Sequence, residues 1–239
     1  MQLFYAPDIV PPLYTLSEQE SAHCVKVLRL ARGESLHLTD GRGTLYLCVV
    51  EEAHPKHCVV RVVDAVDHFE RRDYSITMAV APTKNSDRFE WFVDKAVETG
   101  VDRIIPLTSE HSERRVLNTE RCRKVAVSAV KQSLKAYFPQ IDEPTAFAKV
   151  VAMPFEGRRL IAHCIDSDKK IFLGDTLRKN QDALILIGPE GDFSADEVAL
   201  AREAGFEEIS LGASRFRTET AALAAVMFAF QINSREKEG

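Results

Sequence analysis

The sequence predicts an α/β protein whose mainly parallel sheet follows a small N-terminal module made mostly of strands. Three patterns support this. From Tyr74 onward, short apolar runs alternate with segments of helical periodicity, the pattern of a parallel sheet covered by helices. Two strand-loop-helix units follow one another near the C-terminus. Residues 1–72, by contrast, contain closely spaced strand patterns and little helix. We therefore expect two domains, over residues 1–72 and 73–239.

The N-terminal module is predicted from a hairpin pattern. Residues 36–50 read as a strand, an Asp40-Gly41 turn and a second strand, because Asp-Gly favours the positive backbone angles of hairpin turns. Residues 58–63 form a further strand candidate, and residues 21–30 have the spacing of a short amphipathic helix. The charged run over residues 67–73 marks the expected junction.

The first half of the second domain alternates regularly between strands and helices. A strand over 75–81 precedes a helix that Ser86 is expected to cap and that Gly100 is placed to end. The next elements are predicted as a strand over residues 101–107, a helix opened by Thr119, and a strand over residues 160–165.

The second half contains two tandem units, each with a glycine-bearing loop. Residues 183–187 are uninterruptedly apolar, as in a strand covered on both faces, and Ser194 with Glu197 forms a capping-box signature for the next helix. After the second strand candidate, residues 209–211, Thr218 or Thr220 can cap a long apolar helix. Both loops are expected at one edge of the sheet, where open α/β folds bind ligands.

The two loops exclude the common nucleotide motifs. Gly-x-Gly-x-x-Gly occurs neither at 188–193 nor at 212–217, and no Gly-Lys-Ser/Thr follows the glycines. Pro189 removes a backbone donor, which makes its loop a poor phosphate cradle. An uncharged or zwitterionic ligand with a flat ring suits such loops better. The alternative is that the glycines only make tight strand-to-helix turns.

Three short segments resemble one enzyme family. Gly188-Pro189-Glu190-Gly191, Leu211-Gly212 and Arg217-Thr218-Glu219-Thr220-Ala221 are similar to the RsmE-type family of small-subunit ribosomal RNA methyltransferases. The segment from His23 to Leu30 and the pair Gln132-Ser133 extend the resemblance over nearly the whole chain. Asp192 departs from it, since a second glycine is usual there; Lys131 and Lys135 depart around Gln132.

The resemblance implies both a fold and an activity. The fold is a SPOUT-type parallel sheet with a C-terminal trefoil knot, preceded by a PUA-like RNA-binding β-barrel; the knot rests on the resemblance alone. The activity is methylation of N3 of a uridine in 16S rRNA, with S-adenosylmethionine as donor and a homodimer as the working form. The resemblance implies donor-binding residues Leu186, Ile187, Gly188, Pro189, Glu190, Gly191, Leu211, Gly212, Phe216, Arg217 and Thr218. It implies RNA contacts from His23, Arg29, Lys84, Lys131 and Gln132.

Chemistry suggests catalytic roles for Arg217 and Glu219. Uracil N3 carries a proton, so its lone pair is available only once the base becomes anionic, and a permanent cation beside it favours that state. Arg217, at the junction of loop and helix, is such a cation. Glu219 is interpreted either as the proton acceptor, as a partner that fixes Arg217, or as a first-turn carboxylate that favours the helix dipole.

Charge and composition narrow the class further. A net charge of −5 argues against a general nucleic-acid binder, whereas the basic stretch over 103–135 favours a specific RNA target. The five cysteines contain no Cys-x-x-Cys, which favours a reducing cytoplasm, and no 18-residue apolar run predicts a membrane span. His54, His57 and Cys58 lie close together, but no second cluster has ligand spacing, so no metal is expected.

Two rival functions stay open. One is another SPOUT methyltransferase that acts on a ribose 2′-hydroxyl or on tRNA. The other is a non-catalytic RNA-binding protein that keeps the fold without the chemistry.

Overall fold

The computed structural model describes residues 1–234, so residues 235–239 of the predicted second domain lie outside the described residues. The chain divides into two compact units, Met1–Arg71 with Val127–Phe138, and Arg72–Ala126 with Pro139–Gly239. The sequence-based division after residue 72 stays a prediction.

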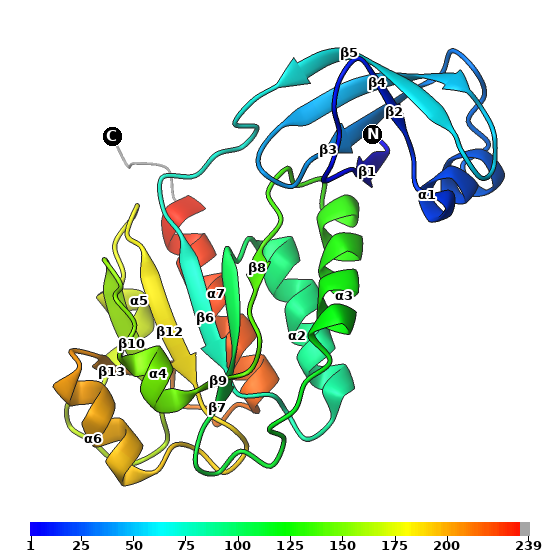
Figure 1. The fold of residues 1–239 in the computed structure, drawn as a ribbon. Coiled ribbons are helices and arrows are strands. Elements are labelled where there is room, and N and C mark those ends of the chain that lie inside the picture. The colour runs from blue at the N-terminus through cyan, green and yellow to red at the C-terminus, as the bar shows by residue number, and fades with distance from the viewer. Residues whose placement is uncertain (235–239) are drawn as a thin grey trace. The chain divides into compact units, whose positions relative to one another are not determined.

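Figure 1 labels the elements along the chain. Their bounds are β1 (Leu3–Tyr5), β2 (Leu13–Thr15), α1 (Glu18–Ala22), the π-helix η1 (His23–Val27), β3 (Ser35–Thr39), β4 (Leu45–Glu52), β5 (Val59–Val66), β6 (Ile76–Val80), α2 (Ser86–Thr99), β7 (Arg103–Thr108), α3 (Thr119–Gln132), β8 (Gln140–Ile141), β9 (Thr145–Ala146), α4 (Phe147–Val151), β10 (Arg158–Ala162), β11 (Ile171–Phe172), α5 (Leu173–Thr176), β12 (Ala183–Ile187), α6 (Ala195–Glu203), β13 (Glu207–Ser210) and α7 (Thr218–Ser234).

The first unit is built on a five-stranded sheet with the order β1-β3-β4-β5-β2. The predicted hairpin is confirmed as β3 and β4, and the Asp40 carboxylate fixes its turn by accepting from the N–H groups of Arg42 and Thr44 at 2.7 and 3.2 Å. The helix predicted over residues 21–30 lies earlier, over 18–27. The hydroxyl of Ser17 accepts from the Glu20 N–H, which starts the helix there, and its second half is π-helical.

Residues 127–138 belong to this first unit. The Ala136 carbonyl accepts from the Thr39 hydroxyl at 3.0 Å, and the Phe138 N–H donates to the Gly41 carbonyl at 2.8 Å. The Phe138 ring also stacks on Tyr5, with ring centroids 5.3 Å apart. The hairpin turn is therefore held by a segment far away in sequence.

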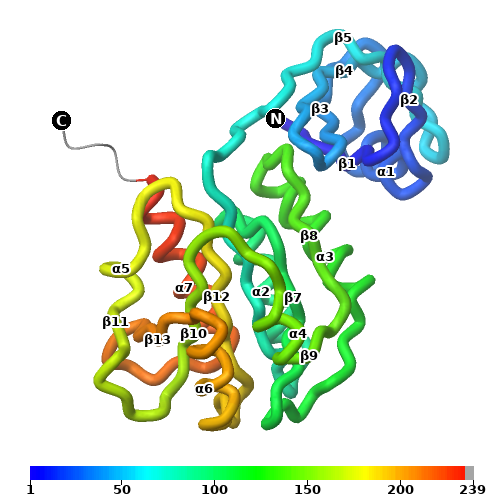
Figure 2. Tube along the Cα trace, turned by 60° about the vertical axis from the view of Figure 1, so that its left-hand side comes forward, coloured from blue at the N-terminus to red at the C-terminus, as the bar shows by residue number. Residues whose placement is uncertain are grey.

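The second unit contains the predicted parallel sheet. Its order is β11-β13-β10-β12-β6-β7-β8, with β9 paired to β7, and each of these pairings is parallel. Every residue of β12 is buried, as the uninterrupted apolar run predicted. Figures 1 and 2 show β10, β12 and β13 side by side, so the turns that follow them meet at one edge.

Helices cover both faces of this sheet, with α4 and α6 on one face and α2 and α7 on the other (Figure 1). Leu184 and Leu186 of β12 pack with Phe147 of α4 and Val198 of α6 in a single buried cluster. On the other face α7 packs against β6, β12 and α2. Burying both faces fixes the strand ends, which is what a ligand site at the sheet edge needs.

Local capping explains where the helices begin and end. The capping box of Ser194 and Glu197 is confirmed, with Glu197 N–H to Ser194 Oγ and Ser194 N–H to Glu197 Oε2. Gly100 ends α2 in the left-handed conformation, as predicted. The cap of α2 differs: Asn85, one residue before the expected Ser86, accepts from the Asp87 N–H. Among residues 1–234 no helix is both long enough and apolar enough to cross a bilayer.

Candidate functional site

A cavity of about 700 Å³ lies at the carboxyl ends of β10, β12 and β13. Three segments form it: the β10 turn (residues 163–170), the β12 loop (residues 188–193) and the β13 loop (residues 211–217). Its volume is within the range of roughly 300–1,000 Å³ that is usual for small-molecule sites. The position is the one that parallel sheets favour for ligands, because strand ends and helix starts meet there.

Most of the predicted donor-binding residues line this cavity. Those that do are Ile187, Gly188, Pro189, Glu190, Leu211, Gly212, Phe216, Arg217 and Thr218. Leu186 is instead fully buried in the sheet, and Gly191 packs against His111, whose Cβ lies 3.0 Å from the place a Cβ on Gly191 would take. The two glycine loops do meet, since the Thr218 hydroxyl donates to the Gly188 carbonyl at 3.1 Å.

The β12 loop is tied to its neighbours by its two acidic side chains. The Glu190 carboxylate accepts from the Lys84 N–H at 3.1 Å, which links the loop to the segment after β6. The Asp192 carboxylate accepts from the Cys164 N–H at 2.7 Å, which links it to the β10 turn. His111 adds a contact from its Nδ1 to the Asp192 carbonyl at 3.1 Å. This wall of the cavity is fixed from several directions.

The β13 loop is exposed and has few internal contacts. Gly212 has φ +120°, with open space where a Cβ would lie, so glycine is needed for the backbone angle rather than for room. Ser210 Oγ accepts from the Gly212 N–H at 3.1 Å. Arg215 and Arg217 both line the cavity and are exposed, and neither has a hydrogen bond or ion pair from its side chain within residues 1–234. The loop therefore contributes to the cavity lining two exposed cations that have no bonded acidic partner among the described residues.

Glu219 lies elsewhere. It is buried in the first turn of α7 and borders a smaller depression with Asp87, Arg88, Trp91 and Thr220. Its Oε1 is 3.9 Å from Arg88 Nε, and its Oε2 has no hydrogen-bond partner among the described residues. Arg217 and Glu219, predicted together, thus face different surroundings.

The β10 turn, which forms the third wall of the cavity, was not predicted from the sequence. His163, Cys164, Asp166 and Lys170 of the β10 turn line the cavity. A signal was present, because the strand before them had been recognised and carboxyl ends of neighbouring parallel strands share one edge. The strand order, which places β10 between β12 and β13, was not readable from the sequence.

A buried hydrogen bond between an imidazole and a carboxylate anchors the β10 turn to β13. His163 Nε2 lies 3.0 Å from Glu208 Oε2, and both side chains are almost completely buried. Burial, together with the nearby Lys170, holds the pKa of His163 below its ordinary value. Burial would raise the pKa of Glu208, but hydrogen bonds from Ser167 and His163 outweigh it and leave that pKa lowered. An ionised Glu208 therefore accepts the Nε2–H of a neutral imidazole.

The predicted RNA contacts fall in both units. His23, Arg29, Lys131 and Gln132 belong to the first unit and Lys84 to the second. Arg29 and Gln132 are exposed, and His23 is half-buried with its ring edge-on to Phe4. Lys131 Nζ lies 2.7 Å from Glu20, and Lys84 Nζ lies 2.9 Å from Glu113. Both lysines thus already have acidic partners.

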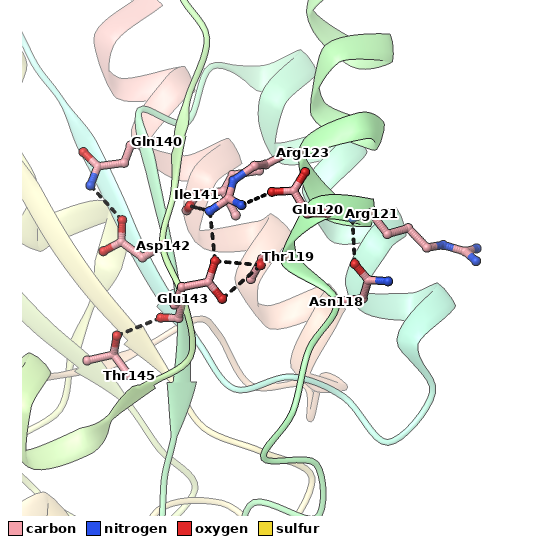
Figure 3. Close-up of polar contacts among 10 residues, drawn as sticks. All are labelled: Asn118, Thr119, Glu120, Arg121, Arg123, Gln140, Ile141, Asp142, Glu143 and Thr145. Atoms are coloured by element: carbon pink, nitrogen blue, oxygen red, sulfur yellow. Dashed lines mark hydrogen bonds and ion pairs between the residues drawn. The ribbon is translucent and has the colours of Figure 1, made fainter.

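Much of the basic stretch over 103–135 is also neutralised by acidic residues, both within the stretch and outside it. Figure 3 shows Arg123 bonded to Glu120, to Glu143 and to the Ile141 carbonyl, with the Thr119 hydroxyl on the same Glu143 carboxylate. Arg103 pairs with Asp142 at 2.6 Å and Arg121 with Glu90 at 2.7 Å. Some cations of this stretch form no ion pair with an acidic side chain among the described residues; they include Arg114, Arg115 and Lys124.

No cluster of three or more His, Cys, Asp or Glu side chains suited to a metal ion occurs in the described part of the chain. The suspected group near residue 54 consists of stacked His54 and His57 rings, 3.6 Å between centroids, with Cys58 fully buried.

Fold and cavity together define the class: an α/β protein that binds a small ligand at the edge of a parallel sheet and carries a β-rich module before it. Matches to two protein-family models make the class more specific. Residues 70–229 match the model for an RNA methyltransferase domain, and residues 16–63 match that for an RNA methyltransferase PUA domain. The chain belongs to the RNA methyltransferase family.

Individual relatives agree over almost the full length. A probable rRNA methyltransferase from Porphyromonas gingivalis is 44% identical, with a TM-score of 0.91 over 98% of this chain and 99% of that one. A ribosomal RNA small subunit methyltransferase E from Neisseria gonorrhoeae, solved bound to S-adenosyl methionine, is 26% identical with a TM-score of 0.87, covering 98% of each chain. The protein of that name from Synechocystis sp. is 27% identical over 98% of this chain and 77% of its own length. The resemblance to the RsmE type is thus confirmed.

Proposed function

We propose that this RNA methyltransferase transfers a methyl group from S-adenosylmethionine to N3 of a uridine in 16S rRNA. One observation carries the proposal: two glycine loops form a single cavity, and the exposed Arg217 lines it. The names of the relatives support rRNA of the small subunit as the substrate class.

The lining of the cavity fits the methyl donor. Ile187, Leu211 and Phe216 offer apolar surface for the flat adenine ring. Asp166 and Glu190 supply negative charge for the cationic ammonium and sulfonium groups. The backbone of the glycine loops can approach such a ligand closely because no side chain intervenes.

S-adenosylmethionine, when bound, supplies an activated methyl group on a positively charged sulfur. The protein's part is to make uracil N3 a nucleophile. Arg217 lines the cavity, and its side chain is bonded to no acid among the described residues, so its charge is available to stabilise the anionic base. The first turn of α7, which begins at Thr218, directs partial positive charge the same way.

The role of Glu219 stays a prediction. An acceptor role is supported by its buried Oε2, which has no hydrogen-bond partner among the described residues. Its position beside Arg88, away from the cavity lining, supports instead a carboxylate that stabilises the start of α7.

Several further properties form part of the proposal. Arg114, Arg115 and Lys124 add cationic surface to the predicted RNA contacts of His23, Arg29, Lys84, Lys131 and Gln132. For Lys131 and Lys84, RNA would have to compete with Glu20 and Glu113. A C-terminal trefoil knot is supported by the insertion of β13 between β10 and β11, the strands that precede it.

The exposed apolar side chains Trp91 of α2 and Met227 and Phe230 of α7 support a homodimer, because large apolar groups on two packed helices favour a protein partner. A cytoplasmic location, and a reaction that needs no metal ion, complete the proposal.

Transfer of labelled methyl groups to 30S subunits, followed by nucleoside separation, tests this function. We expect label in 3-methyluridine. Label in a 2′-O-methyl nucleoside, or transfer to tRNA alone, would favour the rival SPOUT activity. If calorimetry shows RNA binding without S-adenosylmethionine binding, the protein is an RNA-binding protein without catalysis.

A further inference from the structure

Asp192 occupies a backbone conformation that side chains rarely adopt. Its φ is +65°, in the left-handed region, and it lies in the β12 loop where it lines the cavity. Glycine takes this conformation freely, whereas a residue with a Cβ does so at a cost in free energy. Contacts of the Asp192 side chain must offset that cost.

Those contacts link two walls of the cavity. Oδ1 accepts from the N–H of Phe193 at 2.9 Å, which is local to the β12 loop. Oδ2 accepts from the N–H of Cys164 at 2.7 Å, which belongs to the β10 turn. Hydrogen bonds to an ionised acceptor are shorter and stronger than neutral ones. The second bond therefore fixes the spacing between the β12 loop and the β10 turn.

The β10 turn is held from its other side as well. His163, one residue before Cys164, is bound by Glu208 of β13 at 3.0 Å. Since β10 lies between β12 and β13, two carboxylates, one from each neighbouring strand or its loop, hold two successive residues of the turn. The His163 contact is buried inside the sheet, whereas the Asp192 contact lies at the cavity itself.

We propose that Asp192 is a positioning residue of the donor cavity: its bond to Cys164 holds the β12 loop and the β10 turn at the separation that S-adenosylmethionine requires. The identity of the ligand rests on the proposed function, but the bond does not. The competing explanation is that the Asp192 charge attracts the sulfonium directly.

Affinities for S-adenosylmethionine and S-adenosylhomocysteine separate the two explanations, because the second molecule lacks the sulfonium charge. In Asp192→Gly, which keeps the left-handed backbone at no cost, we expect both affinities to fall by about tenfold, the effect of one charge-assisted bond. Asp192→Asn should recover much of the loss, since asparagine tolerates positive φ and keeps an acceptor for Cys164. If Asp192→Gly and Asp192→Asn lose affinity for S-adenosylmethionine equally and both keep the wild-type affinity for S-adenosylhomocysteine, the proposal is overturned in favour of direct charge attraction.

Steady-state kinetics add a second readout. For Asp192→Gly we expect a raised KM for S-adenosylmethionine, with KM for RNA unchanged and kcat at saturating donor close to wild type. A general loss of stability would instead lower the apparent kcat through the folded fraction and leave both KM values unchanged. A raised KM for RNA would also contradict a role confined to the donor cavity.

Amide hydrogen exchange tests the bond without any ligand. The Cys164 N–H should be protected in the wild type and should exchange faster in Asp192→Gly, while amides of β12 keep their protection. The matched control is Asp166→Asn, which removes one charge from the same cavity lining but leaves the Cys164 contact intact. An unprotected Cys164 amide in the wild type refutes the inference even if the donor binds. If the Cys164 amide is protected in the wild type but S-adenosylmethionine does not bind, the proposed function is refuted and the inference about the bond is not.

Discussion

The β12 loop and the β13 loop contribute to the same cavity by opposite means. The β12 loop is held by side-chain bonds to three other segments, through Glu190, Asp192 and the contact from His111. The β13 loop is exposed over residues 212–217, and its cations Arg215 and Arg217 make no side-chain bond among the described residues. One loop supplies shape and the other supplies charge.

The difference follows from what each loop has to do. A fixed wall holds a ligand in one orientation without further ordering when the ligand arrives. In the proposed function, by contrast, the exposed guanidinium of Arg217 acts on an RNA substrate that enters from solvent. A cation already paired with an acid would contribute little to stabilising an anionic base, so the lack of a partner for Arg217 within residues 1–234 is what its proposed role requires.

The largest expected effect comes from removing the charge. We expect Arg217→Ala to lower kcat about 100-fold, the usual size for loss of a group that stabilises developing negative charge. The affinity for S-adenosylmethionine, measured by calorimetry, should change little.

Arg215→Ala is the matched control for that variant, because Arg215 is an exposed cation in the same loop. Its effect on kcat should be clearly smaller. Equal losses in the two variants would mean that the loop provides general positive charge, and near-normal turnover of Arg217→Ala would remove Arg217 from catalysis.

The shape of the β13 loop depends on Gly212. At φ +120° an alanine is strained by about 1–3 kcal/mol, so we expect Gly212→Ala to weaken S-adenosylmethionine binding by about tenfold. Gly205→Ala is the control, since Gly205 has φ +85° and equally open surroundings but lies at the end of α6. It should lower stability without changing affinity in the folded protein. Identical affinity losses would show that strain anywhere in the unit disturbs the cavity.

His163, in the β10 turn, should make the free energy of unfolding depend on pH. Because the pKa of His163 is lowered in the folded state, the unfolded chain binds the proton more tightly, with an ordinary pKa of about 6.5. The stabilisation is present above that value and is lost as the pH falls toward the folded pKa, by at most about 1.4 kcal/mol per pH unit.

Urea unfolding of wild type and His163→Asn between pH 5 and 8 measures this difference. The groups facing His163 are Glu208, Lys170 and Asp192, and all are unchanged in the variant. If the free energy of unfolding changes with pH by the same amount in both proteins, His163 does not titrate as we infer. Glu208 contributes in the same direction at lower pH, since its pKa is also lowered.

The smallest effect concerns Lys131, whose ammonium is paired with Glu20 in the first unit. We expect a coupling of about 1 kcal/mol in a double-mutant cycle of Lys131→Ala and Glu20→Gln, measured by unfolding. If Lys131 also contacts RNA, Glu20→Gln should tighten RNA binding by freeing the ammonium, while Lys131→Ala weakens it. Unchanged RNA affinity in both variants would leave the lysine with a structural role only.

What the sequence predicted well was local. The apolar run of β12, the capping box at Ser194 and the hairpin turn at Asp40 each depend on a few neighbouring residues, and all are confirmed. What it missed depends on distant partners. Glu219 was paired with Arg217 by proximity in sequence, yet its carboxylate lies beside Arg88. Asp192 was predicted only as a departure from the family's glycine pattern, because its bond to Cys164 spans 28 residues and could not be read from the neighbouring sequence.

The return of residues 127–138 to the first unit constrains how the molecule can be made and cut. A fragment ending at residue 72 lacks Ala136 and Phe138, so it leaves the Thr39 hydroxyl and the Gly41 carbonyl without the groups that bind them. During synthesis, likewise, these two groups gain their partners only after more than half of the polypeptide has been made. Helix α3 belongs to both units, since its residues up to Ala126 lie in the second and those from Val127 lie in the first, so a cut inside this helix would damage both.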